Sequence, residues 1–156
     1  MPPDLAPGGA EPVDAQLKVI ERLRAAIQRR DPAAAESALN DAYGVGLHQA
    51  MSAAMIELVE SPWHTRHEDA VHALQQLRSP DAIDALERLA TTEHDYLGYD
   101  EFKGLARKCI WALADIGKPA ARAALTRLAE SPDSQASAYA RRRLARWDVE
   151  LGRKLT

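Results

Sequence analysis

The sequence predicts an all-α protein in which helix pairs stack side by side as a short α-solenoid. Three observations lead to this fold class: few aromatic residues, apolar residues at helical spacing, and an internal repeat. Aromatic residues make up only 5% of the 156 residues. Alanine and leucine recur throughout, and both lose little side-chain entropy in a helix. Strands have little material from which to form.

The first twelve residues differ in composition from the rest of the chain. They contain four prolines and two glycines, which deprive a helix of backbone donors and of conformational order. We expect a disordered leader over residues 1–12 and one helical repeat domain over residues 13–156. From Asp14, apolar residues at three- and four-residue steps predict a helix that ends near Arg30.

Asp31 and Pro32 form a cap and first-turn pair for a second helix, which should end near residues 44–46. Residues 47–59 then carry apolar positions at helical spacing and predict a third helix. This helix should end before Pro62, because proline cannot continue it.

Two further helix starts are visible in the middle of the chain. Thr65 lies three residues before Glu68, the spacing of a capping box, so a helix should begin there. The segment 79–81, with its proline, begins another helix whose apolar positions are Ile83, Leu86 and Leu89.

Internal repetition turns this succession of helices into a solenoid. Segment 73–90 aligns with segment 112–129 without a gap, and nine of the eighteen positions are identical. Segment 60–62 likewise matches segment 130–132 at every position. The repeated unit is a helix pair. We expect about three and a half such hairpins after one additional N-terminal helix, in a monomer.

The repeated pairs resemble HEAT-like repeats, including the short bacterial kind described around phycobilisome lyases. The residues that carry the resemblance are CIWALADIG at 109–117, Pro119 and ALTRLA at 124–129. The resemblance covers residues 32–148, and it implies a scaffold that mostly binds proteins and occasionally nucleic acid. WHxxHED at 63–69, YLxYD at 96–100 and KCIWAL at 108–113 together resemble small bacterial HEAT proteins found beside toxin genes. That resemblance implies a toxin-neutralising immunity protein.

One interval between equivalent positions is longer than the next. The chain takes more residues to pass from Leu74 to Leu113 than from Leu113 to Leu144, the next equivalent leucine. The first interval therefore holds an insert, and the stretch without helical periodicity is 91–100. Loops that interrupt a regular scaffold are disproportionately functional, so we expect this insert to contact a protein partner.

The candidate partner-binding residues combine acids with large aromatic side chains. They are Trp63, His67, Glu93, Asp95, Tyr96, Tyr99, Asp100, Glu101, Lys108 and Trp111. The tyrosines could be interface anchors or could plug a gap between repeats. Trp111 points roughly 200° from Cys109 on a helical wheel, so it is either an interface anchor or packed beneath the insert or the preceding repeat.

Charge is unevenly distributed along the chain. Residues 57–101 hold eleven acids against three arginines, whereas residues 131–156 hold six basic residues against three acids. The acidic belt suits a basic partner and would repel phosphates. Arg141, Arg142, Arg143 and Arg146 point around their helix, so we expect a solvated helix face and no nucleic-acid partner.

Metal binding and catalysis find little support in the sequence. Four histidines, His64, His67, His72 and His94, lie in the same part of the chain, but no zincin pattern or cysteine pair accompanies them. We therefore expect helix-start and surface histidines and no metal. No nucleophile stands beside a recognisable base, and Cys109 lies on the apolar stripe of its helix, so we expect neither an enzyme nor a cofactor.

These observations favour a cytoplasmic, non-enzymatic protein-binding module. The single cysteine cannot close an intrachain disulfide, and no apolar run approaches the roughly 20 residues of a membrane span. Occlusion of a basic toxin domain by the acidic insert is the leading hypothesis. The alternatives are a general adaptor that links cellular proteins and a protein that handles a small molecule or tetrapyrrole.

Overall fold

The structure, a computed structural model, describes residues 10–98, 100–101 and 103–155. Over this part of the chain it consists of α-helices and short 3-10 helices without any strand, which confirms the all-α prediction. The α-helices are α1 (Asp14–Arg29), α2 (Pro32–Val45), α3 (Ser52–Val59), α4 (His67–Leu77), α5 (Ile83–Leu89), α6 (Gly104–Ile116), α7 (Pro119–Ala129), α8 (Ser134–Ala145) and α9 (Trp147–Leu155). The 3-10 helices are η1 (Gln49–Met51), η2 (Pro80–Ala82) and η3 (Asp95–Leu97).

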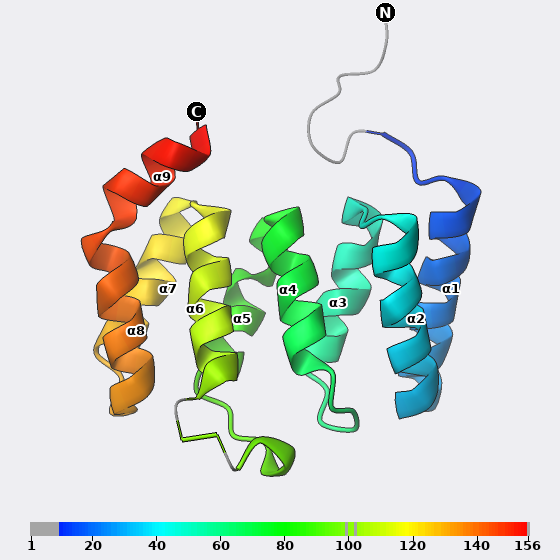
Figure 1. Ribbon diagram of the computed structural model, residues 1–156, viewed down its shortest axis with the longest axis horizontal. Helices are drawn as coiled ribbons and strands as arrows, with labels where there is room; N and C mark the ends of the chain where they lie inside the picture. The colour runs from blue at the N-terminus through cyan, green and yellow to red at the C-terminus, as the bar shows by residue number, and fades with distance from the viewer. Residues whose placement is uncertain (1–9, 99, 102, 156) are drawn as a thin grey trace, which may run out of the picture.

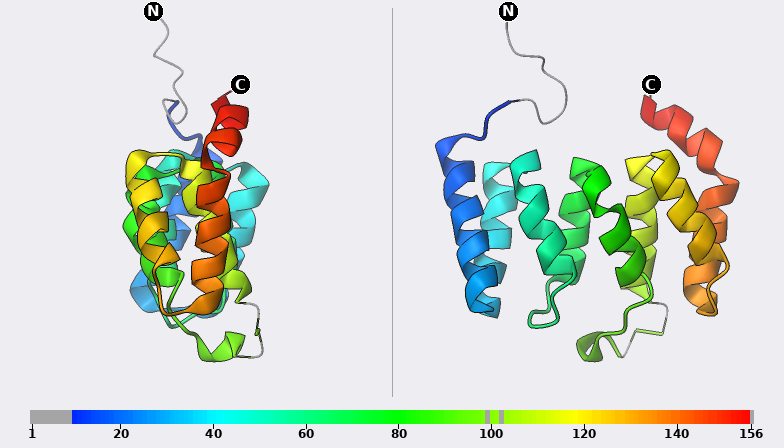
Figure 2. Two further views of the ribbon diagram at one scale, coloured as in Figure 1. Left: turned by 90° about the vertical axis from the view of Figure 1, so that its left-hand side faces the viewer. Right: turned by 180° about the vertical axis from the view of Figure 1, so that it is seen from behind.

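The helices form two parallel layers. Figure 1 shows α2, α4, α6 and α8 side by side in the layer nearer the viewer, and Figure 2 shows α1, α3, α5 and α7 in the layer behind. Across the two layers, α1 contacts α2, α3 contacts α4, α5 contacts α6 and α7 contacts α8. Contacts also run along the layers, from α1 through α3 and α5 to α7 and from α4 through α6 to α8. This stacking confirms the predicted all-α solenoid, in which the N-terminal helix α1 packs against α2.

The hydrophobic core is continuous along the array between the two layers. Its largest fully buried side chains include Leu23, Leu39, Leu74, Leu113 and Leu125, one from each of five helices. Burial of one such leucine stabilises the fold by about 2 kcal/mol. Alanines fill the positions between them, so neighbouring helix backbones can approach closely. Each helix pair is thus stabilised chiefly by the pairs beside it.

Several helix boundaries agree with the sequence prediction. Asp31 caps α2, because its Oδ1 accepts the backbone N–H of Ala34 at 3.1 Å. The chain leaves α1 at Arg30, whose φ of 51° is left-handed. Cys109 is fully buried, and that burial raises the pKa of its thiol, as expected for an inert core residue.

Other boundaries need correction. The capping box predicted between Thr65 and Glu68 does not form: α4 begins at His67, and no side chain caps its first turn. The Glu68 carboxylate instead pairs with Lys108 of α6 at 2.9 Å. The segments 47–59 and 79–89 are also not single α-helices, because η1 and η2 precede α3 and α5.

The two ends of the helices differ in what they carry. The loop 60–66, the described residues of the inserted loop (90–98, 100–101 and 103) and the turn 130–133 all lie at the lower end in Figure 1, which we call the insert end. At the other end, α9 contacts α6: the Lys154 ammonium donates to the Ala114 carbonyl oxygen at 2.9 Å and pairs with Asp115 at 2.6 Å. Of the predicted leader, only residues 10–12 fall within the described part of the chain. No helix in that part has the length and apolar character needed to cross a membrane.

Candidate functional site

The inserted loop is tied to the helix that follows it. Asp100 closes the loop, because its Oδ2 accepts the backbone N–H of Gly104, the first residue of α6, at 2.7 Å. A Cβ at Gly104 would lie 2.9 Å from that carboxylate oxygen, so a larger residue here would displace the Asp100 side chain. Lys103, just before the helix, adopts a left-handed φ of 49°. The acid and the glycine together set the direction in which α6 leaves the loop.

Five aromatic rings from two loops and α4 pack together at the insert end; we call them the ring column. They are Trp63, His64, His67, His94 and Tyr96. The centroid of the His67 ring lies 4.1 Å from the His64 ring, 4.1 Å from the His94 ring and 5.7 Å from the Tyr96 ring. Trp63 meets the edge of His64 at 5.1 Å. Stacking at these distances joins the loop 60–66 to the insert.

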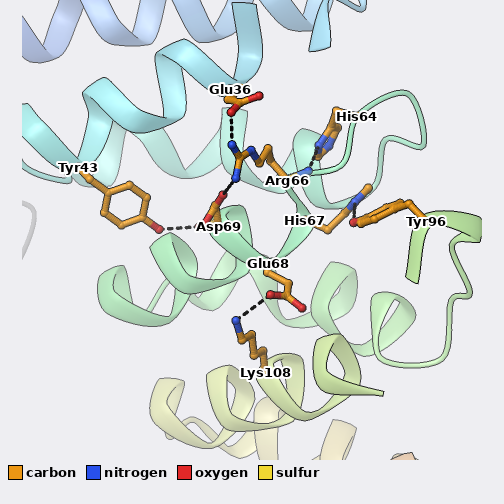
Figure 3. A network of polar contacts seen from close by, with 9 residues as sticks. All are labelled: Glu36, Tyr43, His64, Arg66, His67, Glu68, Asp69, Tyr96 and Lys108. Atoms are coloured by element: carbon orange, nitrogen blue, oxygen red, sulfur yellow. Dashed lines mark hydrogen bonds and ion pairs between the residues drawn. The ribbon is translucent and has the colours of Figure 1, made fainter. Parts of the chain in front are cut away.

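Hydrogen bonds fix His67 as a neutral ring. Its Nε2 lies 2.6 Å from the Ser61 carbonyl oxygen, and its Nδ1 lies 2.6 Å from the Tyr96 hydroxyl. Because a carbonyl can only accept, Nε2 carries the proton, and Nδ1 accepts from the tyrosine. Figure 3 shows Tyr96 reaching His67 from the insert.

His64 is held in the same tautomer by its own loop. Its Nε2 lies 2.6 Å from the Leu58 carbonyl oxygen, while its Nδ1 accepts the backbone N–H of Arg66 at 2.9 Å. A proton added at Nδ1 would face that N–H, so the bond would be lost. Both histidines therefore use both ring nitrogens within the protein.

Burial keeps these rings uncharged. It lowers the pKa of His67 to about 4, against the opposing effect of the Ser61 carbonyl, and neighbouring His64 and His94 add to the lowering. Burial likewise lowers the pKa of His64 and of His94. His67 lies at a helix start, as predicted. His64 and His67 are 2% and 0% exposed, however, so neither is a surface histidine. Sequence reasoning missed them because the rings that cover them come from the insert.

Arg66 links the loop 60–66 to α2 and α4. Its guanidinium pairs with Glu36 of α2 and, at 3.4 Å, with Asp69 of α4. The Tyr43 hydroxyl donates to the Asp69 carbonyl oxygen at 2.6 Å, and Figure 3 shows both contacts beside the ring column. The loop is therefore held from two sides.

A pocket of about 300 Å³ lies between the insert and the first turns of α6 and α8. We call it the acidic pocket. Its charged lining residues are Glu93, Asp95, Asp100 and Asp133 against one cation, Lys103. The Lys103 ammonium pairs with Asp133 at 2.5 Å and lies 3.8 Å from Glu93, and its bond to Asp133 holds the pKa of that carboxyl below its usual range.

The four carboxylates of the acidic pocket differ in how far they are engaged. Asp133 pairs with Lys103 and caps α8, accepting N–H groups of Gln135 and Ala136, each at 3.1 Å. Asp100 caps α6. The Glu93 side chain is 88% exposed, and Asp95 is also exposed. Glu93 and Asp95 are therefore the acids best placed to meet a ligand.

The structure brings together most of the residues singled out from the sequence. Glu93, Asp95 and Asp100 line the acidic pocket, and Glu101 is exposed beside it. Trp63 and Tyr96 stand in the ring column and are half-buried. The contacts of Tyr96 with His67 favour the packing alternative for this tyrosine. Tyr99 lies outside the described residues.

Three of the predicted residues lie elsewhere or out of reach. His67 is fully buried, so it supports Tyr96 and offers no surface to a partner. Lys108 pairs with Glu68 between α4 and α6. Trp111 was expected under the insert, on the preceding repeat or at an interface. It faces α8 rather than the insert, with the Arg143 guanidinium over its ring, 3.7 Å from the centroid. Its role at an interface stays a prediction.

Arg143 also corrects the expectation of a solvated arginine face on the last helices. It is only 6% exposed, and its Nη1 donates to the Glu150 carboxylate of α9 at 2.8 Å. No sequence pattern indicates this pair, because α9 turns back against the array after α8. Lys103, His94 and Asp133 were missed for a similar reason, since their meeting depends on the path of the insert.

The ring nitrogens of His64 and His67 and the Tyr96 hydroxyl have protein partners. Within the described residues, no group of three or more His, Cys, Asp or Glu side chains is arranged to hold a metal ion. The Nε2 atom of His94 is buried and has no hydrogen-bond partner in that part of the chain. The chemistry that remains at the insert end is electrostatic: carboxylates that can receive a cation.

Comparison with known protein families agrees with the repeat seen in the structure. Residues 105–131 match the family described as the PBS lyase HEAT-like repeat. The matched segment covers α6, α7 and the turn between them. Comparisons with curated proteins and with solved structures gave no match.

Proposed function

Because the chain is a HEAT-like repeat protein, we propose that it is a non-catalytic scaffold whose insert end binds a basic segment of a protein partner. Repeats of this family suggest a protein-interaction role and are generally non-catalytic. Stacked helix pairs expose one extended surface and leave their loops free to vary. The observation that carries the proposal is the acidic pocket, with the exposed carboxylates of Glu93 and Asp95 at its mouth.

The charge and size of the acidic pocket define the ligand. Four carboxylates face one ammonium group, so the pocket favours a cation over an anion. Its volume of about 300 Å³ is small, at the lower limit of small-molecule pockets, and suits one long basic side chain. A lysine or arginine of the partner would pair with Glu93 and Asp95 at the mouth.

The support beneath the insert lowers the cost of binding. The ring column and the Asp100 cap hold the insert in place before a partner arrives. A preordered loop loses less conformational entropy on binding than a mobile one. Exposed Glu101 and Glu130 at the same end add long-range attraction for a basic surface.

We further propose that the partner is a toxin domain with a basic surface, such as a nuclease, and that the chain neutralises it by occlusion in the cytoplasm. The acids at the insert end and the resemblance of residues 63–69, 96–100 and 108–113 to immunity proteins support this finer proposal. A nuclease binds nucleic acid through basic residues, so an acidic cover on that surface would block its substrate.

A titration with an acetylated tetra-lysine peptide tests the insert end directly. In proton–nitrogen NMR spectra we expect the amide signals of residues 93–98 to shift as the peptide is added. The double variant Glu93→Lys, Asp95→Lys should bind at least about tenfold more weakly, because two attractions become repulsions. The control Glu11→Lys, Glu21→Lys makes the same change in net charge at exposed positions near α1. Equal losses in the two variants would contradict a specific pocket.

Capture from the native cell then identifies the partner. Wild-type chain and the Glu93→Lys, Asp95→Lys variant serve as paired baits, and mass spectrometry compares what each retains. A toxin retained only by the wild type, whose co-expression with the chain restores growth, would support neutralisation. A non-toxic protein retained in that way would favour the adaptor alternative. A co-purifying coloured ligand would favour tetrapyrrole handling.

A further inference from the structure

A second pocket lies between α6 and α8, away from the insert end, with a volume of about 260 Å³. We call it the arginine pocket. It is lined by Arg107, Ile110, Trp111, Tyr139, Arg142 and Arg143. Arg107 and Trp111 are four residues apart on α6, and Tyr139 stands three and four residues before Arg142 and Arg143 on α8. Each set thus shares one face of its helix.

Arg143 forms a fixed, positively charged wall of this pocket. Its guanidinium carbon lies 3.7 Å from the centroid of the Trp111 ring, and Glu150 accepts its Nη1 hydrogen bond at 2.8 Å. Burial lowers the pKa of Arg143, and the nearby guanidinium charges of Arg146, Arg142 and Arg107 act in the same direction. Like charges therefore converge at this point on the surface.

Arg107 and Arg142 differ from the other cations of this region. Lys108 pairs with Glu68, Arg146 with Glu150 and Lys154 with Asp115. Among the residues that the structure describes, Arg107 and Arg142 are exposed and have neither an ion pair nor a side-chain hydrogen bond. Two unpaired guanidinium groups beside a buried third are an arrangement that an anion would stabilise.

We propose that the arginine pocket is a second docking site, and that it receives a carboxylate-bearing segment of a protein partner. Guanidinium groups offer paired N–H donors that match the two oxygens of a carboxylate. Trp111 and Tyr139 add ring surface against which the aliphatic part of an aspartate or glutamate packs. This inference does not depend on the insert end binding a basic partner.

The surroundings of the pocket favour a short acidic peptide over a nucleic acid. Within the described part of the chain, two cations of the pocket are unpaired, whereas tight binding of nucleic acid neutralises on the order of six or more phosphates. The next helix of the same layer, α4, carries Glu68 and Asp69. A phosphate backbone that continued from α8 across α6 would have to compete with these acids for their partners, Lys108 and Arg66.

The test uses the full chain and an acetylated tetra-glutamate peptide. The chain contains three tryptophans, and a Trp111→Phe variant identifies which indole N–H signal belongs to Trp111. During the titration we expect the Trp111 signal to shift while the Trp63 signal stays in place. The double variant Arg107→Glu, Arg142→Glu should weaken binding at least tenfold.

The matched control is Lys18→Glu, Arg24→Glu, which makes the same change in net charge at exposed positions of α1. It should bind the peptide like the wild type, and thermal unfolding should show that both variants fold. No shift at Trp111, equal loss in the control, or tighter binding of a short single-stranded DNA than of the peptide would each overturn the proposal. Because the tetra-lysine titration reports on the insert, failure of one site is distinguishable from failure of the other.

Discussion

The ring column and the arginine pocket both gather polar side chains between helices, yet their hydrogen bonds are arranged in opposite ways. His64 and His67 use every ring nitrogen on a partner within the protein. Arg107 and Arg142 have no such partner among the described residues. A buried side chain whose polar atoms are all paired within the protein stabilises the fold, whereas an exposed charged group without such a partner can bind a ligand. Four predictions test this division.

The largest expected effect is on the fold. Replacement of His67 by Ala should lower the free energy of unfolding by about 3 kcal/mol, because it opens a cavity and leaves the Ser61 carbonyl and the Tyr96 hydroxyl without their partner. Urea denaturation measures the loss. His72→Ala is the control, since His72 is exposed on the same helix, and should change stability by no more than about 0.5 kcal/mol. Equal losses of unfolding free energy in the two variants would show that the ring column does not stabilise the fold more than an exposed histidine does.

Acid should weaken the fold through the same histidine. Its pKa is lowered from 6.5 to about 4, so the unfolded chain binds the proton more readily than the folded chain between these values. The contribution of His67 is therefore fully present above pH 6.5 and is lost as the pH falls toward 4, by about 3 kcal/mol in all. Urea melts at several pH values measure this slope. A His67→Ala variant with an unchanged slope would refute the assignment.

A smaller loss is expected when the hydrogen bond between Tyr96 and His67 is removed and both rings remain. Tyr96→Phe keeps the ring in the column but deletes the hydroxyl that donates to His67 Nδ1. We expect a loss of about 1 kcal/mol in unfolding free energy. Faster amide exchange in the insert should accompany it. If stability and exchange were both unchanged, the tyrosine would not be part of the support.

The arginine pocket should show the smallest effect on stability. Arg107→Gln together with Arg142→Gln removes two charges that repel the Arg143 guanidinium and that form no ion pair with the described residues. The melting temperature should stay the same or rise slightly, equivalent to at most about 0.5 kcal/mol. A marked fall in the melting temperature would mean that these arginines stabilise the fold. The arginine pocket would then not differ from the ring column in the way proposed.

The sequence was sufficient for the fold because its signals are local or periodic. Helical spacing, the Asp31 cap and the internal repeat each need only neighbouring or equivalent residues. The insert was also located in this way, from the extra residues between Leu74 and Leu113. The sequence thus pointed to Glu93, Asp95 and Asp100 as candidate binding residues, and the structure shows that they line the acidic pocket.

The contacts that build the sites could not be derived in the same way. His67 and His94 are far apart in the chain, and their stacking depends on how the insert turns back beneath α4. Thr65 looked like a helix cap, but His64 instead accepts the nearby Arg66 N–H and α4 begins two residues later. Arg143 looked solvated, because nothing in the chain predicts that α9 brings Glu150 to it.

The ring column has a consequence for how the array comes apart. In a stacked repeat protein, each unit touches only its neighbours, so unravelling starts at the termini and spreads inward. The stacked rings clamp the loop before α4 to the loop after α5. Unfolding that spreads inward from either end should therefore be slowed by the ring column. We expect α4 and α5 to be the last helices to exchange their amide protons.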